Sequence, residues 1–318
     1  MKLSRMKTTL GLFLAAILSA PAFGVNTPLP GTLNYVEGQA QIASQDLSAK
    51  SVGSAELQTG QTISTENGRA EILLTPGVFL RLDDNSAAEM ISPGLTNTEV
   101  RLTKGRALLE VAELHRQNDI KITEVGTTTQ ILKNGLYEFN AGNGEVQVFE
   151  GKANVSDHDK TITLKGGHQL SVAAGKNAAL KAQKFDKKND VDDFYNWSAL
   201  RSEYASEANV DVAQMVPGGF VTPGWFWDPW FSEYTFVPGN GIFYSPFGWG
   251  FYSPAFIGYA PGFYYGRPYY GPYRPGYYGR AHYIGPAGRG IAPMRTAPAM
   301  HAGVGGFHGG GFGGGARR

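Results

Sequence analysis

The chain has 318 residues, with 43 glycines, 18 prolines and no cysteine. The formal net charge of +1 hides a segregation, because residues 25–215 carry −7 and residues 216–318 carry +5. The lack of cysteine excludes disulfides, thiolate metal sites, cysteine nucleophiles and lipoprotein acylation, so packing and hydrogen bonds must hold the fold.

Residues 1–24 have the pattern of a signal peptide. A basic start is followed by an apolar run over residues 10–18 and by small residues that suit cleavage after Ala22 or Gly24. The apolar run is shorter than the ~20 residues that a membrane-spanning helix needs. We therefore expect export to the periplasm or cell surface and no transmembrane helix in the mature chain; an uncleaved anchor is the alternative.

Residues 30–183 are expected to form a mainly β domain. Short segments of alternating or β-branched apolar residues are separated by Gly, Asn or Asp, which is typical of antiparallel strands with one buried face. The clearest hairpin joins residues 136–140 to residues 145–149 through a turn that contains Asn143-Gly144. About a dozen strands are expected, which fits a sandwich, a barrel or a short solenoid.

Residues 188–214 are expected to form one amphipathic helix, with Asp190 available as its cap. We expect its aromatic face to close the open end of the β domain; docking to a partner is the alternative. Glu203 and Glu207 fall on the polar side. The inner face would comprise Val191, Phe194, Tyr195, Trp197, Leu200, Arg201 and Tyr204.

The C-terminal part of the chain divides into two segments of different composition. Residues 216–254 are rich in Trp, Pro and Gly, and so much aromatic surface favours docking on the β domain. Residues 255–318 are rich in Gly, Tyr and Arg, a composition that favours a disordered tail.

The aromatic and arginine side chains of these segments are the candidate binding residues. Tyr and Arg side chains attract one another weakly, which favours self-association. Aromatic rings also stack on sugars, and Arg pairs with phosphate or carboxylate of envelope polymers. A passive spacer is the alternative, and export argues against nucleic acid as a partner. The candidates are Trp225, Trp227, Trp230, Trp249, Tyr264, Tyr265, Arg267, Tyr269, Tyr270, Arg274, Tyr277, Tyr278 and Arg280.

No pattern in the sequence indicates an enzyme. The six histidines lack zinc-site spacing, and there is no nucleophile elbow, no Walker loop and no dinucleotide-binding Gly motif. We therefore expect no catalytic residue, no metal and no cofactor. A glycan hydrolase is an alternative for which no acid/base pair can be named.

The β domain resembles the FecR-domain family. The resemblance rests on residues 60–65, residues 68–74, residues 100–107 and residues 146–153, and it extends over nearly all of residues 33–182. It implies an all-β module outside the cytoplasmic membrane, whose best-known members relay a signal from an outer-membrane transporter to a sigma factor. Here a signal peptide stands where those members carry an anti-sigma segment and a membrane helix.

The sequence therefore favours a non-enzymatic exported protein. A FecR-like β module would act as a binding or scaffold domain, and the tail would contact glycan, another envelope polymer or itself. The alternative is a periplasmic sensory module that docks on an envelope protein, a transporter or a regulator.

Overall fold

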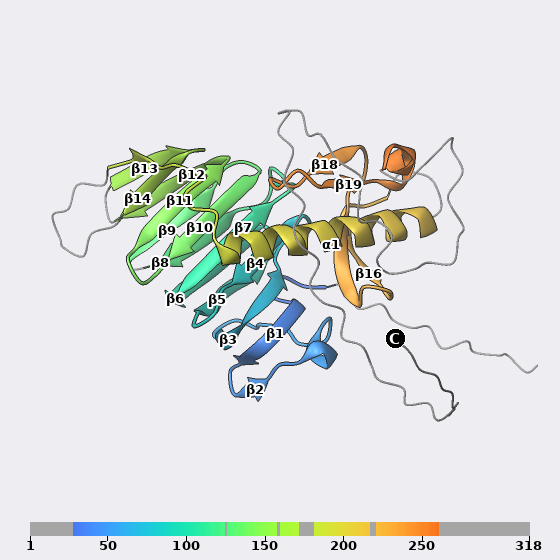
Figure 1. Cartoon of the computed structure of the whole chain (residues 1–318), viewed down its shortest axis with the longest axis horizontal. Helices are drawn as coiled ribbons and strands as arrows, with labels where there is room; N and C mark the ends of the chain where they lie inside the picture. Colours follow the sequence, from blue (N-terminus) through green and yellow to red (C-terminus); the bar gives the residue numbers. More distant parts are fainter. Residues whose placement is uncertain (1–27, 125, 158–159, 172–180, 217–220, 261–318) are drawn as a thin grey trace, which may run out of the picture. The chain divides into compact units, whose positions relative to one another are not determined.

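The computed structural model of this protein describes residues 28–124, 126–157, 160–171, 181–216 and 221–260 (Figure 1). The expected signal peptide, and the tail from residue 261 onward, lie outside these residues. The main feature of the described part is a fifteen-stranded sheet, antiparallel except for one parallel pair of strands. The mainly β prediction is confirmed.

Two long strands, β1 (Leu33–Ile42) and β3 (Thr62–Leu73), form the hairpin from which the sheet grows. The short β2 (Gln45–Asp46) and the 3-10 turn η1 (Ala49–Ser51) connect them. The first residues of β3 pair with β5 and its last residues pair with β4, so β3 belongs to two halves of the sheet.

Glycine permits this hairpin to bend where Gly38 lies opposite Gly68. A Cβ on Gly68 would lie 2.4 Å from the backbone oxygen of Glu37, so no larger residue fits without a backbone shift. The register is irregular at this point, which is the usual signature of a β-bulge.

The sheet divides at β3 into two halves, one whose outer face is covered by later parts of the chain and one whose outer face is exposed. The covered half comprises β4 (Val78–Leu82), β7 (Arg106–Val111), β10 (Gly135–Asn140), β11 (Glu145–Glu150), β14 (His168–Ser171) and β15 (Gln183–Lys184). The exposed half comprises β5 (Ala87–Gly94), β6 (Asn97–Lys104), β8 (Ile120–Glu124), β9 (Thr127–Ile131), β12 (Lys152–Asp157) and β13 (Lys160–Lys165).

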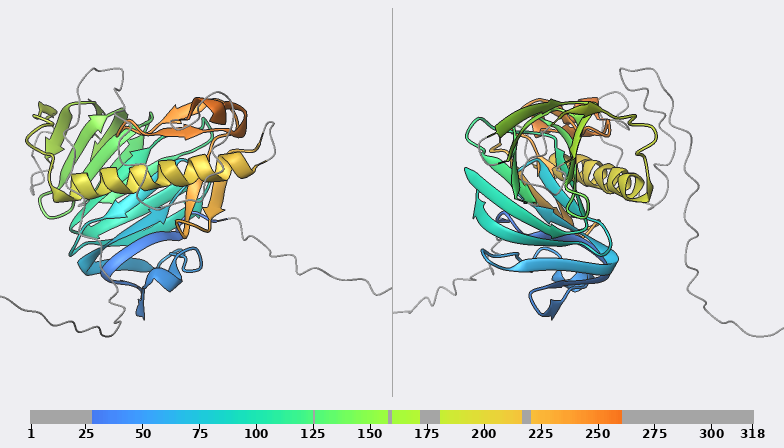
Figure 2. Two further views of the ribbon diagram at one scale, coloured as in Figure 1. Left: turned by 45° about the vertical axis from the view of Figure 1, so that its right-hand side comes forward. Right: turned by 90° about the vertical axis from the view of Figure 1, so that its left-hand side faces the viewer.

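The chain passes back and forth between the halves as it moves away from β3. Leu80, Leu109 and Tyr137 of the covered half share one apolar core with Val100 and Val155 of the exposed half. The fold thus combines the face-to-face packing of a sandwich with the stepwise winding of a solenoid (Figure 2). The predicted hairpin is present as β10 and β11, with Asn140 opposite Glu145.

A single long helix, α1 (Asp193–Met215), lies across the outer face of the covered half (Figures 1 and 2). It begins after Asp192, whose carboxylate accepts a hydrogen bond from the Tyr195 backbone, so Asp190 is not the cap. The helix is confirmed, but it covers a sheet face and does not close an end. Leu200 and Tyr204, expected on the inner face, are 39% and 40% exposed.

Two aromatic hairpins complete the layer over the covered half. They are β16 (Gly224–Asp228) with β17 (Glu233–Val237), and β18 (Ile242–Tyr244) with β19 (Gly250–Tyr252), followed by the 3-10 turn η2 (Pro254–Tyr259). Their aromatic rings form a second core with Leu73 and Phe79 of the sheet. Residues 255–260, which the sequence placed in the disordered tail, therefore belong to this folded layer.

Candidate functional site

The outer face of the covered half is built from strands that alternate charged with apolar side chains. Glu71 on β3, Arg81 on β4 and Glu110 on β7 point to this face, and all three are 0% exposed. The same alternation in a half-exposed strand would place such charges in water. Here α1 and the β16–β17 hairpin cover them.

Two arginines join three buried glutamates into one network. Arg81 donates to Glu71 at 2.7 Å and to Glu110 at 2.6 Å. Arg201 on α1 donates to Glu71 at 3.2 Å and also to Glu233 on β17. The network therefore ties the sheet, the helix and the first hairpin together through charge-assisted hydrogen bonds.

The network holds its carboxylates at different pKa values. Burial alone would raise the pKa of Glu71, but Arg201 and Arg81 outweigh it and lower this pKa to about 2. Burial raises the pKa of Glu233 to about 7, because Arg201 is its single cationic partner and Glu71 adds repulsion. Two cations face three carboxylates, so the network favours one proton on Glu233 near neutral pH.

Uncharged side chains extend this attachment along both hairpins. The Asn34 side chain donates to the Tyr234 backbone at 3.1 Å and accepts from it at 2.8 Å. The Asn209 side chain on α1 donates to the backbone oxygens of Phe236 and Tyr252 and accepts from the Tyr252 backbone at 2.7 Å. The hairpins are therefore a fixed part of the folded domain.

A second ion cluster holds the start of α1. Arg106 on β7 donates to Glu138 at 2.6 Å and to Asp192 at 2.7 Å, and it lies 3.4 Å from Asp83. Its guanidinium also stacks over the Phe194 ring at 5.3 Å. Burial raises the pKa of Glu138 to about 7 against the opposing effect of Arg106. These contacts fix the first turn of the helix on the sheet.

The layer presents aromatic side chains at its surface. Trp230 in the β16–β17 turn is 67% exposed, and Trp227 is 36% exposed. Tyr204 of α1 lies beside this turn, with its ring 6.3 Å from that of Phe231. These side chains form the aromatic surface patch, defined as Tyr204, Trp227, Trp230 and Phe231.

The structure separates the predicted binding residues into three groups. Trp227 and Trp230 are in the aromatic surface patch, and Trp249 is half-buried near the β18–β19 turn. Trp225 is 6% exposed and packs edge-on against Phe79 at 5.0 Å, so its ring is not accessible for stacking. The others lie outside the described residues: Tyr264, Tyr265, Arg267, Tyr269, Tyr270, Arg274, Tyr277, Tyr278 and Arg280.

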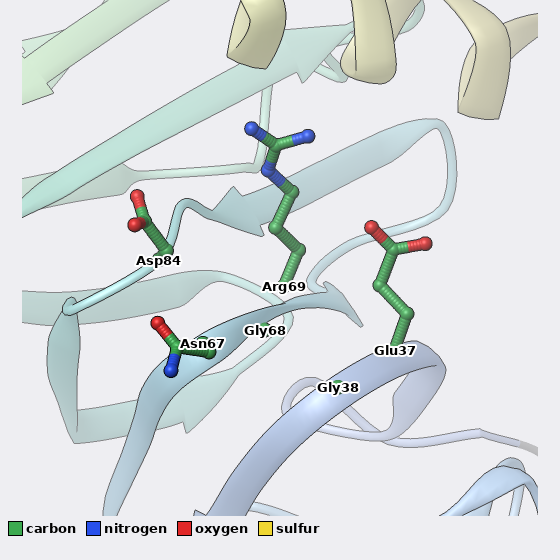
Figure 3. A pocket seen from close by; sticks show the side chains of 6 residues that line it. All are labelled: Glu37, Gly38, Asn67, Gly68, Arg69 and Asp84. Atoms are coloured by element: carbon green, nitrogen blue, oxygen red, sulfur yellow. The ribbon is translucent and has the colours of Figure 1, made fainter.

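A shallow depression lies at the bend of the β1–β3 hairpin, in front of α1 (Figure 3). Glu37, Asn67, Arg69 and Asp84 line it, and Gly38 with Gly68 forms its floor. Arg69 is held by Asp83 at 2.9 Å and by the Trp197 ring at 5.5 Å. The depression is polar and open, and it lacks the enclosure typical of a small-molecule pocket.

The described residues contain no group of three or more His, Asp or Glu side chains placed to hold a metal ion. Buried carboxylates with raised pKa values are present, but Glu138 and Glu233 each pair with an arginine under the helix. Glu124 is 1% exposed and faces the core between the halves. Within the described part of the chain, no helix is long and apolar enough to cross a bilayer.

Residues 61–154 match the family model described as FecR protein. No functionally curated protein matches the chain. Two crystal structures of candidate anti-sigma factors from Parabacteroides distasonis ATCC 8503 are similar, at 12% and 16% identity with TM-scores of 0.35 and 0.36. The matches cover 56% and 55% of this chain and 98% and 82% of the two solved chains.

Proposed function

Because residues 61–154 of this chain form a FecR domain, we propose that the protein is a non-enzymatic binding or scaffold protein of the cell envelope. The FecR domain serves as a rigid support. The C-terminal layer and the tail that follows it contact glycan, another envelope polymer or a second copy of the protein.

One observation carries this proposal: a fixed part of the domain exposes large aromatic rings. Trp230 is 67% exposed on a hairpin in which Tyr234 is held by Asn34 and Glu233 by Arg201. Exposed tryptophan on a rigid support loses little conformational entropy when it binds, and its flat face matches the apolar face of a sugar ring.

The export predicted from the sequence supports the same proposal. The first 24 residues have the basic, apolar and small-residue regions of a signal peptide, and the chain has no cysteine that an oxidising compartment would pair. An exported protein meets polysaccharide, peptidoglycan and anionic lipid, which are partners that aromatic and arginine side chains recognise.

Pull-down on purified cell-wall and exopolysaccharide fractions tests the proposal. Replacing Trp227 and Trp230 by alanine is expected to weaken retention about tenfold, since aromatic contacts contribute about 0.5–1.5 kcal/mol each. Leu95→Ala is the matched control, because Leu95 is 52% exposed on the β5–β6 turn, away from the hairpins. Equal retention of the double variant and the wild type on every fraction would refute the role of the rings.

The FecR match also supports a second candidate, a sensory module that docks on an envelope transporter or regulator. In this case the outer face of the exposed half, which α1 leaves uncovered, is the available surface. Crosslinking in intact cells tests it. Recovery of a single envelope protein whose capture is lost on substituting Thr163 and Arg101 would favour this candidate, and recovery of no protein would exclude it.

A further inference from the structure

The outward face of α1 carries a row of three carboxylates, Glu203, Glu207 and Asp211, named here the acidic row. They recur every four residues, so one helical turn separates each from the next. No ion pair or hydrogen bond joins these three side chains to another described residue. Leu200 and Tyr204 lie beside them at 39% and 40% exposure.

A second, independent feature adds to the negative charge at the end of the row. Asp228 on β16 is 0% exposed; its Oδ1 accepts hydrogen bonds from the Trp230 and Phe231 backbones, and among the described atoms its Oδ2 has no hydrogen-bond partner. After burial, the charge of Asp228 is the cause that raises the pKa of Asp211, to about 6. Burial and the flanking Glu203 and Asp211 raise the pKa of Glu207 to about 7. Among the residues that the structure describes, no cationic side chain forms an ion pair with the row.

The spacing of the three carboxylates determines which kind of cation can bind all of them. The row extends over eight residues of helix, about 12 Å, so one metal ion with its oxygen ligands at about 2–2.6 Å cannot contact all three carboxylates. The described residues also form no metal-binding group here. Several cationic side chains along one segment match a row of this length, and the neighbouring rings of Tyr204 and Phe231 suit a segment that is also aromatic.

The chain itself contains such a segment beyond the described residues. Residues 261–318 have seven arginines and no Asp, Glu or Lys, and residues 262–280 combine Arg267, Arg274 and Arg280 with many tyrosines. Arginine is suited to this pairing because its planar guanidinium binds carboxylates in pairs of hydrogen bonds and stacks on tyrosine rings.

We propose that the acidic row of α1 binds residues 262–280 of a second copy of this chain. The inference rests on the proposed function, and it assigns the surface through which copies associate. The contact joins two different surfaces, so it is heterologous and each copy offers both a donor segment and an acceptor row. Such contacts continue from copy to copy unless they close into a ring.

The test mixes two complementary variants of the full chain. The row variant carries Glu203→Gln, Glu207→Gln and Asp211→Asn and keeps its tail. The tail variant carries Arg267→Gln, Arg274→Gln and Arg280→Gln and keeps its row. In sedimentation velocity at about 0.05 M salt, where surface charges are weakly screened, each variant alone is expected to associate about tenfold more weakly than the wild type. The equimolar mixture is expected to form a one-to-one complex.

A matched control changes the same number of charges elsewhere. The variant Asp46→Asn, Glu56→Gln, Glu66→Gln is expected to associate like the wild type, because these residues belong to β2, β3 and the chain between them. A mixture that stays monomeric, or a control that weakens association equally, overturns the proposal. Retention on polysaccharide is measured on the same row variant, so failure here is distinguishable from failure of the proposed function.

Discussion

The two halves of the sheet share one core, but the charged side chains on their outer faces are buried in one half and exposed in the other. In the covered half, Arg81 and Glu71 are fully buried 2.7 Å apart under α1. In the exposed half, Arg101 and Glu89 form a pair of 3.1 Å whose side chains are 47% and 28% exposed. An ion pair therefore has no fixed energy in this fold, because its contribution to stability depends on whether a layer of side chains and backbone covers it.

Replacing the arginine of each pair by methionine should give the largest difference in stability between a variant of the covered half and a variant of the exposed half. Arg81→Met leaves Glu71 and Glu110 without their shared cation under the helix and is expected to destabilise the domain by about 3–5 kcal/mol. Arg101→Met, the matched control, is expected to change stability by less than about 1 kcal/mol. Urea unfolding of both variants at pH 7 measures the difference, and equal losses would remove the distinction between the halves.

Glu124 is a buried carboxyl of the exposed half that faces inward. Among the described atoms, neither of its carboxylate oxygens has a hydrogen-bond partner. Burial, then the nearby Glu145, raises its pKa to about 8. A carboxyl whose folded pKa lies above its unfolded value costs stability as pH rises from about 4.5 to 8, since the unfolded chain releases its proton first.

Glu124→Gln should therefore stabilise the protein at pH 8 relative to the wild type, and leave it little changed at pH 5. The difference is expected to reach up to about 4 kcal/mol at pH 8. Thermal unfolding of both proteins at a series of pH values checks it. A difference that is constant with pH would show that Glu124 is not protonated in the folded state.

The substitution Asn209→Ala tests how far the stability of the layer over the covered half depends on hydrogen bonds between uncharged groups. Asn209→Ala removes three buried hydrogen bonds to the two hairpins and is expected to cost about 2–3 kcal/mol. Asn154→Ala in the exposed half removes one exposed bond, to Thr163, and should cost less than about 0.5 kcal/mol. Hydrogen exchange of the hairpin amides should increase in the first variant alone; unchanged exchange there would show that the hairpins are held without Asn209.

Local sequence predicts the strands and the β10–β11 hairpin well, because alternation and an Asn-Gly turn act over a few residues. It does not distinguish Arg81 from Arg101, since both alternate with apolar neighbours on strands of similar composition. The difference comes from residues far along the chain: Arg201 and Glu233, which meet the Arg81 network, follow it by more than a hundred positions. No local pattern carries that information.

The surface of α1 was predictable only in part, for a related reason. Aromatic residues recur at helical spacing, but the buried side of the helix is largely small and polar, with Ser198, Ser202, Ala205 and Asn209. Ser202 is inside because Glu110 of the sheet accepts its hydrogen bond, and Asn209 is inside because it bonds to backbone groups of the hairpins. Their polar contacts place Leu200 and Tyr204 outside, and the same rotation leaves Glu203 and Glu207 half-buried side by side.

The Asn34–Tyr234 contact joins residues 200 positions apart, so the layer over the covered half is completed only when nearly the whole described chain is present. Contacts of such long range slow folding. While α1 and the hairpins are still absent, Glu71, Arg81 and Glu110 face water and stay hydrated. An incomplete chain therefore shows a partly charged face where a purely apolar one would promote aggregation.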